Sequence, residues 1–159
     1  MDFLSHILWA NLLFRKKQWR WQGVAFAILP DFPIALVMPL YILGYNVDAM
    51  RQLWSIDFAT HSLLVIGILF VLASLYLKRY YYPLIFGSTL HVFTDLVTHK
   101  GSHAGYPPGT ALFYPLTEFR IDGIINYEKD LWFLVLNFGA LILIYSYIYL
   151  KGKKQNEGV

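Results

Sequence analysis

The sequence predicts an all-α protein, a polytopic membrane helical bundle of about four to five membrane-embedded helices with a long outer loop. Composition is the first reason: 57% of the 159 residues are hydrophobic and only 14% are charged, which is unlike a soluble domain. The second reason is that residues 131–150 carry no charge. A helix of that length, at about 1.5 Å per residue, spans roughly 30 Å of hydrocarbon.

Further apolar segments cover residues 3–14, 23–45, 58–77 and 83–99. Each of them contains at least one ionisable side chain, namely His6 in the first, Asp31 in the second, His61 in the third, and His91, Asp95 and His99 in the fourth. Residues 58–77 are nearly as apolar as 131–150, and residues 23–45 and 83–99 are predicted membrane spans with polar interiors. The first segment is too short to cross a bilayer alone, so we expect a half-buried helix or one surrounded by the others.

Basic residues follow the first, third and last of the five segments, and this distribution predicts the orientation. If all five segments cross, the positive-inside rule places these connections and the C-terminus in the cytoplasm of a prokaryotic cell. The N-terminus, residues 46–57 and residues 100–130 would then face outward. This asymmetry also accounts for the net charge of +3, so no nucleic-acid partner is expected. The residues on the predicted cytoplasmic side are Arg15, Lys16, Lys17, Arg20, Lys78, Arg79, Lys151, Lys153 and Lys154.

We expect one integral membrane domain over residues 1–159, with a helical core at 1–150 and a polar, frayed cytoplasmic tail at 151–159. Residues 100–130 are rich in glycine, proline and aromatic side chains, and we expect them to pack as a lid. Residues 46–54 are predicted to form a short interfacial helix. The N-terminus has no basic stretch before its apolar residues, which is unlike a cleavable signal peptide.

A candidate metal site stands out because ionisable groups inside hydrocarbon are costly and usually have a partner or a function. His91, Asp95 and His99 are four residues apart, so they share one face of a helix. Imidazole and carboxylate are zinc ligands, and the chain has no cysteine, so thiolates are excluded. The other ligands would come from different segments, and the candidates are Asp31, His61 and His6.

The depth of each residue in straight helices argues against one compact site. At about 1.5 Å per residue, Asp31, His6 and His91 lie roughly 12 Å above the cytoplasmic end, and His61 and His99 lie roughly 24 Å above it. Asp95 falls between these levels. A cluster of two metals with Asp95 in the middle fits better, particularly since Pro30 and Pro33 predict a kinked or unwound chain around Asp31.

Each candidate also has a structural interpretation. A single histidine such as His6 or His61 is often a hydrogen-bonded packing residue, Asp31 could cap a broken helix, and Asp95 could pair with a histidine. His103 and Glu118 are expected to be solvated loop residues. Ser62 follows His61 directly, but adjacent helical residues do not face each other, so a nucleophile and base pair is not expected there.

Short motifs in the first 125 residues, FLSHILWANL, ILPDFP, THSLL, LHVFTDLVTHKG and YPLTEFRIDG, resemble those of the YdjM-like family of membrane-bound metal-dependent hydrolases. That family is distantly similar to the zinc-dependent phospholipase C fold. The resemblance implies one complete zinc site at Asp31, His61, His91 and Asp95, and part of a neighbouring site at His6 with Asp95. Two features differ from the phospholipases. They use a mature N-terminal amine as a metal ligand, whereas here Met1 and Asp2 precede His6 differently. They also carry a later His-x3-Glu, which this chain lacks.

The sequence therefore favours a membrane-embedded hydrolase in which one or two zinc ions, or another divalent metal, activate water toward a phosphate ester of a lipid or lipid-like substrate. Asp31 or Asp95 would be the general base. The substrate headgroup would lie under the outer loop, where Arg120 and Lys100 could contact its phosphate. The alternatives are a non-enzymatic metal-binding membrane protein, such as a transporter or sensor, and a structural protein whose polar residues only join helices.

Overall fold

A computed structural model describes residues 1–44, 55–78, 80–101 and 108–157, and every regular element within these ranges is helical. The all-α prediction is therefore confirmed. The predicted interfacial helix at 46–54 and the loop residue His103 lie outside the described residues. In chain order the elements are α1 (Phe3–Leu13), α2 (Arg20–Ile28), the 3-10 turn η1 (Leu29–Asp31), α3 (Phe32–Ile42), a short helix at 55–60, α5 (Leu63–Leu77), α6 (Tyr82–Thr98) and α7 (Leu131–Glu157).

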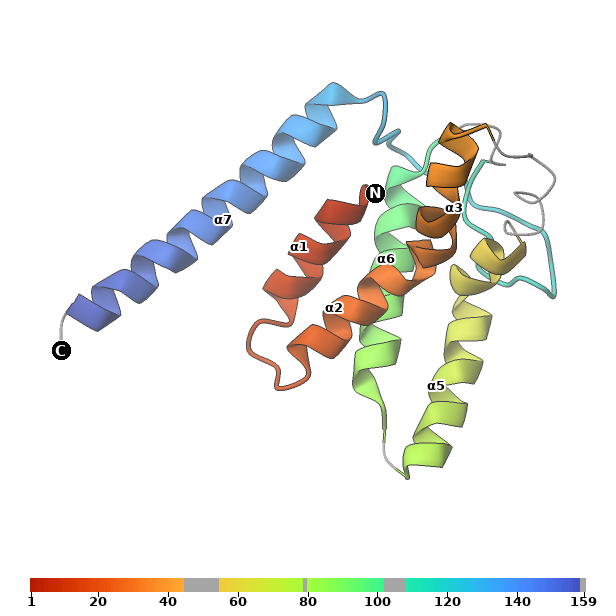
Figure 1. Ribbon diagram of the computed structural model, residues 1–159, viewed down its shortest axis with the longest axis horizontal. Helices are drawn as coiled ribbons and strands as arrows, with labels where there is room; N and C mark the ends of the chain where they lie inside the picture. Colours follow the sequence, from red (N-terminus) through yellow and green to blue (C-terminus); the bar gives the residue numbers. More distant parts are fainter. Residues whose placement is uncertain (45–54, 79, 102–107, 158–159) are drawn as a thin grey trace.

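The closest helix packing joins α2 to α6, as Figure 1 shows near the centre of the molecule. Gly87 of α6 makes this approach feasible, because a Cβ atom there would lie 2.5 Å from the carbonyl oxygen of Gly23 and 3.0 Å from the nitrogen of Ala27. Small residues at a helix crossing let two backbones come together in this way. The packing brings the backbone of α2 against the face of α6 that carries His91 and Asp95.

The second segment is kinked at the point that its prolines predict. Helix α2 ends at Ile28, and Pro30 and Asp31 lie in the single turn η1 before α3 begins. The carbonyl oxygen of Pro30 accepts a hydrogen bond from Thr60 Oγ1 at 2.9 Å. The interrupted backbone is therefore satisfied by a neighbouring segment, as irregular chain inside a membrane protein requires.

The third segment is broken, although its continuous apolar character predicts one helix over residues 58–77. The chain is helical at 55–60, leaves the helix at His61 and Ser62, and enters α5 at Leu63. Ser62 is the N-cap of α5, and its Oγ also donates to the carbonyl oxygens of Leu112 and Tyr114 at 3.1 and 2.8 Å. The break thus ties the loop at residues 112–114 to the bundle.

Helix α7 lies at the edge of the molecule beside α1 (Figure 1). Polar side chains make part of this contact: Trp9 Nε1 donates to Asn137 Oδ1 at 2.8 Å, and Asn137 Nδ2 donates to Ser5 Oγ at 2.7 Å. The tail predicted to be frayed continues the helix as far as Glu157.

Among the described helices, one is long and apolar enough to cross a membrane, and it covers Leu131–Lys153 with a mean hydropathy of 2.0. Helices α1 and α5 are apolar but shorter. The structure therefore supports a helical bundle with one clear candidate span, whereas the predicted four to five spans are not established by helix length.

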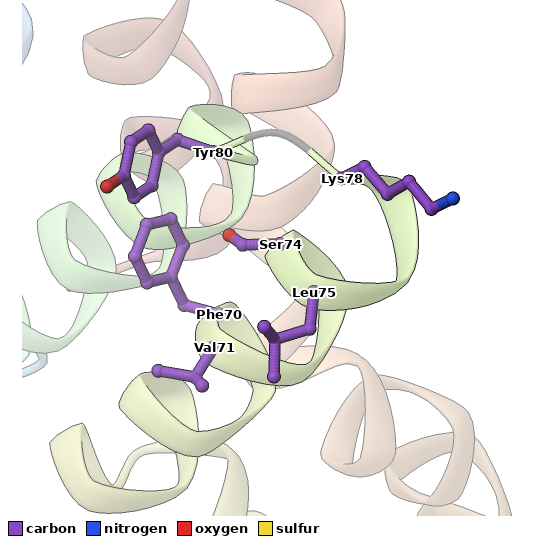
Figure 2. Close-up of a pocket in the computed structure, with 6 residues that line it drawn as sticks. All are labelled: Phe70, Val71, Ser74, Leu75, Lys78 and Tyr80. Atoms are coloured by element: carbon purple, nitrogen blue, oxygen red, sulfur yellow. The ribbon is translucent and has the colours of Figure 1, made fainter.

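The connection between α1 and α2 and the ends of α5 and α7 lie toward one end of the molecule, while the N-terminus and the end of α6 lie toward the other (Figure 1). An open cavity of about 480 Å³ lies near the first end, between the last turns of α5 and Tyr80. Figure 2 shows Phe70 and Tyr80 on one side of it, with the Lys78 side chain extending outward. None of the candidate metal ligands lines this cavity.

Candidate metal centre

Four side chains from separate parts of the chain meet in one buried cluster. One ligand atom from each lies within 4.8 Å of the others, an arrangement that could hold a metal ion. Two come from α6, one from the turn η1 and one from the break before α5, and they are Asp31, His61, His91 and Asp95. The depth estimate from straight helices was therefore wrong, because the kink at Asp31 and the break at His61 allow both residues to reach α6.

Hydrogen bonds to backbone carbonyls orient both imidazoles of the cluster. His91 Nδ1 donates to the carbonyl oxygen of Ala27 at 2.7 Å, and His61 Nδ1 donates to that of Asp57 at 2.8 Å. Because a carbonyl oxygen only accepts, each Nδ1 must carry the hydrogen, and in a neutral ring Nε2 then bears a lone pair. The two Nε2 atoms face each other at 3.0 Å, so two electron-pair donors point at the same place.

The carboxylates add oxygen donors to the same place. Asp95 Oδ2 lies 2.9 Å from His91 Nε2 and 3.4 Å from His61 Nε2, and it is buried with no hydrogen-bond partner in the described part of the chain. Asp31 Oδ1 lies 3.4 and 3.5 Å from the same two nitrogens. Two carboxylate oxygens, together with two imidazole nitrogens once the rings are neutral, match the charge and ligand type of a divalent cation such as zinc. The residues present therefore fit a metal ion.

The second carboxylate oxygen of Asp95 faces a further group of nitrogens. His6 Nε2 lies 3.0 Å from Asp95 Oδ1, and His99 Nε2 lies 3.6 Å from it. The backbone nitrogen of Met1 contacts Asp95 Oδ1 and lies 3.1 Å from His99 Nε2. The other five predicted ligands thus lie around Asp95.

His6 is oriented in the same manner as the other rings. Its Nδ1 lies 3.2 Å from Thr94 Oγ1, whose hydroxyl donates to the carbonyl oxygens of Leu90 and His91. The hydroxyl oxygen therefore accepts from His6 Nδ1, and Nε2 is left with its lone pair toward Asp95. The His6 ring also stacks on His91, with ring centroids 3.9 Å apart, so the two sides of the cluster are in direct contact.

The outer loop closes over the end of α6, where His99 is the C-cap. The nitrogen of Gly123 donates to the carbonyl oxygen of His99 at 3.2 Å, and a Cβ atom on Gly123 would lie 2.7 Å from the His99 carbonyl carbon. This close approach explains the glycine that ends the YPLTEFRIDG motif. Tyr127 packs on the His99 ring at 5.1 Å between centroids, and burial together with Glu128 raises the pKa of its hydroxyl. The described part of the loop therefore packs against the end of α6, and its role as a lid stays a prediction.

Comparison with known proteins supplies the family. The YdjM inner membrane protein family matches residues 1–158. The chain belongs to this family. No curated protein and no solved structure matches it. Membership supports a membrane location, with a lipid bilayer as the surroundings of this YdjM protein. The polar cluster therefore belongs to a member of an inner membrane protein family.

Asp57 is a further residue of the YdjM centre that the sequence interpretation did not select. It is almost fully buried, and its Oδ1 lies 3.5 Å from His61 Nδ1, while its backbone oxygen accepts from the same nitrogen. A carboxylate behind a metal-ligating histidine fixes the ring and increases its basicity. Asp57 precedes His61 by four residues, which is the spacing of one helical turn. That spacing is the sequence signal from which a contact between the two side chains could have been predicted.

We expect Asp57→Asn to weaken metal binding by about 10- to 100-fold, as loss of a carboxylate behind a ligand histidine does elsewhere. The affinity is measured by competition with a fluorescent zinc chelator on the purified full-length protein. Glu118→Gln, at an exposed loop position, is the matched control and should bind as the unchanged protein does. Equal affinities for Asp57→Asn and the control would show that the carboxylate plays no part in the centre.

Proposed function

We propose that this YdjM protein is a membrane-embedded, metal-dependent hydrolase that acts on a phosphate ester of a lipid or lipid-like substrate. The observation that carries the proposal is the convergence of two imidazole lone pairs and two carboxylates on one point. A zinc ion bound there would supply Lewis-acid chemistry, lowering the pKa of water to about 7 and polarising a phosphoryl oxygen.

The two aspartates have different surroundings, which supports different roles. The side chain of Asp95 is fully buried, with one oxygen toward each group of nitrogens, so we assign it to holding one metal or bridging two. The side chain of Asp31 remains 22% exposed. Asp31 is therefore the group that water and substrate can reach, and we assign to it the role of general base.

A second ion would lie on the other side of Asp95. There the donors are His6 Nε2, His99 Nε2 and Asp95 Oδ1. Two neutral imidazoles and one carboxylate oxygen form a weaker set than the first, so we expect the second ion to bind less tightly. His6→Ala should then lower metal content without emptying the first position.

We further propose that the whole bundle is embedded alongside α7, with the centre toward the outer face. Large apolar side chains are exposed on α5 as well as α7, including Leu72 at 57% and Leu143 at 72%, and lipid would cover them. The basic connections at the opposite end of the molecule would face the cytoplasm. The substrate would then enter from the outer leaflet, beneath the loop that ends near Tyr127.

One observation favours a second candidate, a metal-binding protein without catalysis. Four protein ligands can complete a tetrahedral zinc site, whereas catalytic zinc sites keep one position open. The candidate ligands of the first site number four. A transporter or sensor would use such a closed site. An enzyme would also need Asp31 to leave the metal, so that one coordination position opens for water or substrate.

Turnover separates the two candidates. The full-length protein, purified with zinc, is placed in phosphatidylcholine vesicles containing phosphatidic acid or an isoprenyl monophosphate, and released phosphate is measured. The hydrolase proposal predicts release that stops on chelation and falls at least 100-fold in Asp31→Asn, while Glu118→Gln is unaffected. Stoichiometric metal with no release from either phosphate monoester, and with no headgroup released from phosphatidylcholine, would instead support the non-enzymatic protein.

A further inference from the structure

Arg120 is a cation of the outer loop that packs against the protein, and part of its guanidinium has no acceptor among the residues that the structure describes. The guanidinium carbon lies 3.8 Å from the centre of the Phe58 ring, a stacking arrangement that holds the plane of the group. Its Nη1 atom is buried, and no atom of the described residues accepts a hydrogen bond from it. A buried donor without an acceptor is unfavourable, so this nitrogen is suited to a ligand that brings one.

The loop around Arg120 is held in place by backbone contacts. Thr110 and Ile121 exchange two backbone hydrogen bonds at 2.9 and 3.1 Å. Gly109 lies beside this pair with a φ of +79°, and a Cβ atom there would lie 2.6 Å from the oxygen of Ile121. Tyr114, whose oxygen accepts from Ser62, packs edge-on to the Phe58 ring with centroids 5.9 Å apart. Arg120 is thus anchored at the break before α5.

This anchor point adjoins the metal centre. Phe58 precedes His61 by three residues, and the His61 nitrogen still closes the last helical turn by donating to the Asp57 oxygen at 3.0 Å, so the two side chains are neighbours on that turn. Thr60, one of the two residues between them in the chain, donates to the carbonyl oxygen of Pro30, which precedes Asp31. The guanidinium is therefore stacked on a ring within one turn of His61, in a segment that also bonds to the residue before Asp31.

We propose that Arg120 binds the non-bridging oxygens of a phosphate group placed at the metal centre. The inference rests on the proposed function and narrows its substrate to an anionic phosphate. With two carboxylates and two neutral imidazoles, a divalent ion leaves the first site without net charge, so a phosphate needs a further cation. The planar fork of arginine matches phosphate oxygens two at a time. A neutral ester or peptide offers the guanidinium no anionic oxygen, so it would not balance the arginine charge.

The test is direct binding of two probes to the full-length, zinc-loaded protein in phosphatidylcholine nanodiscs. Inorganic phosphate and dioctanoyl phosphatidic acid are titrated by calorimetry into the unchanged protein, Arg120→Gln, Arg120→Lys and Lys129→Gln, an exposed loop control. We expect Arg120→Gln to weaken binding at least 10-fold, Arg120→Lys to weaken it less, and the control to bind normally. Tighter binding of the lipid than of inorganic phosphate assigns the site to a lipid phosphate, and equal binding assigns it to free phosphate.

Metal content of the same samples separates this inference from the proposed function. Unchanged phosphate affinity in Arg120→Gln at normal metal content overturns the role of Arg120 alone. Loss of metal or of the folded state in both arginine variants makes Arg120 a structural residue and also overturns it. Absence of metal from the unchanged protein overturns the proposed function. If phosphate affinity still depends on Arg120 in that case, the proposal that Arg120 binds phosphate is retained.

Discussion

Asp95→Asn is expected to leave the protein without stoichiometric metal and without metal-dependent turnover. The amide has almost the shape of the carboxylate, but it removes a charged ligand atom from both groups of nitrogens, at His91 and at His6. With Asp31 as the remaining anion, the first site loses half of the charge that balances a divalent ion. Metal content by mass spectrometry, measured per chain after purification without chelators, is the readout.

Two further variants make this result specific. His6→Ala touches one side of Asp95 and should retain the ion at the first site, whereas Glu118→Gln should retain all metal. The folded state of each is compared by size exclusion and thermal unfolding in the same detergent. If Asp95→Asn remained folded with the metal content of Glu118→Gln, the central position of Asp95 would be wrong.

Gly87→Ala is expected to destabilise the bundle by about 1–3 kcal/mol, the usual cost of overpacking a filled interior. The added methyl would meet backbone atoms of α2, at 2.5 Å from the Gly23 oxygen, and backbone cannot rotate away as a side chain can. Separation of α2 from α6 would also move the Ala27 oxygen from His91 Nδ1. A lower midpoint of thermal unfolding and a reduced metal affinity should therefore appear together.

Gly67→Ala provides the matched comparison for this glycine. It also lies within a helix, α5, but no atom lies within 4 Å of the position that its Cβ would take. Alanine is favoured over glycine in a helix by roughly 0.5–1 kcal/mol, so we expect no loss of stability and unchanged metal binding. A loss at Gly67 as large as that at Gly87 would show that helix contact is not the cause.

Most of the helical architecture could be predicted because local rules decide it. The run of uncharged residues predicts α7, and Pro30 and Pro33 predict the kink that becomes η1. The break at His61 could not be predicted in the same way, since the apolar character of the segment continues through it. Tertiary hydrogen bonds from Ser62 to the outer loop stabilise that break, and such distant partners leave no local pattern.

The candidate site was predictable in its membership but not in its geometry. The spacing of His91, Asp95 and His99 correctly predicts that they meet, because α6 is regular between them. The depth estimate, which assumes straight helices, places His61 too far from His91 and Asp31, because the chain turns out of the helix at His61. Asp57 was counted with the charged residues of an outer connection, and its burial behind His61 emerges only from tertiary packing.

Anomalous diffraction at the zinc absorption edge, from crystals of the zinc-loaded protein, tests the central claim most directly. The account predicts a peak about 2.0–2.2 Å from His61 Nε2, His91 Nε2 and one oxygen of Asp95, the usual zinc distances to these ligand types, with Asp31 beside it. A zinc-soaked crystal with these side chains in place and no peak between them would contradict the claim that this cluster is a metal centre.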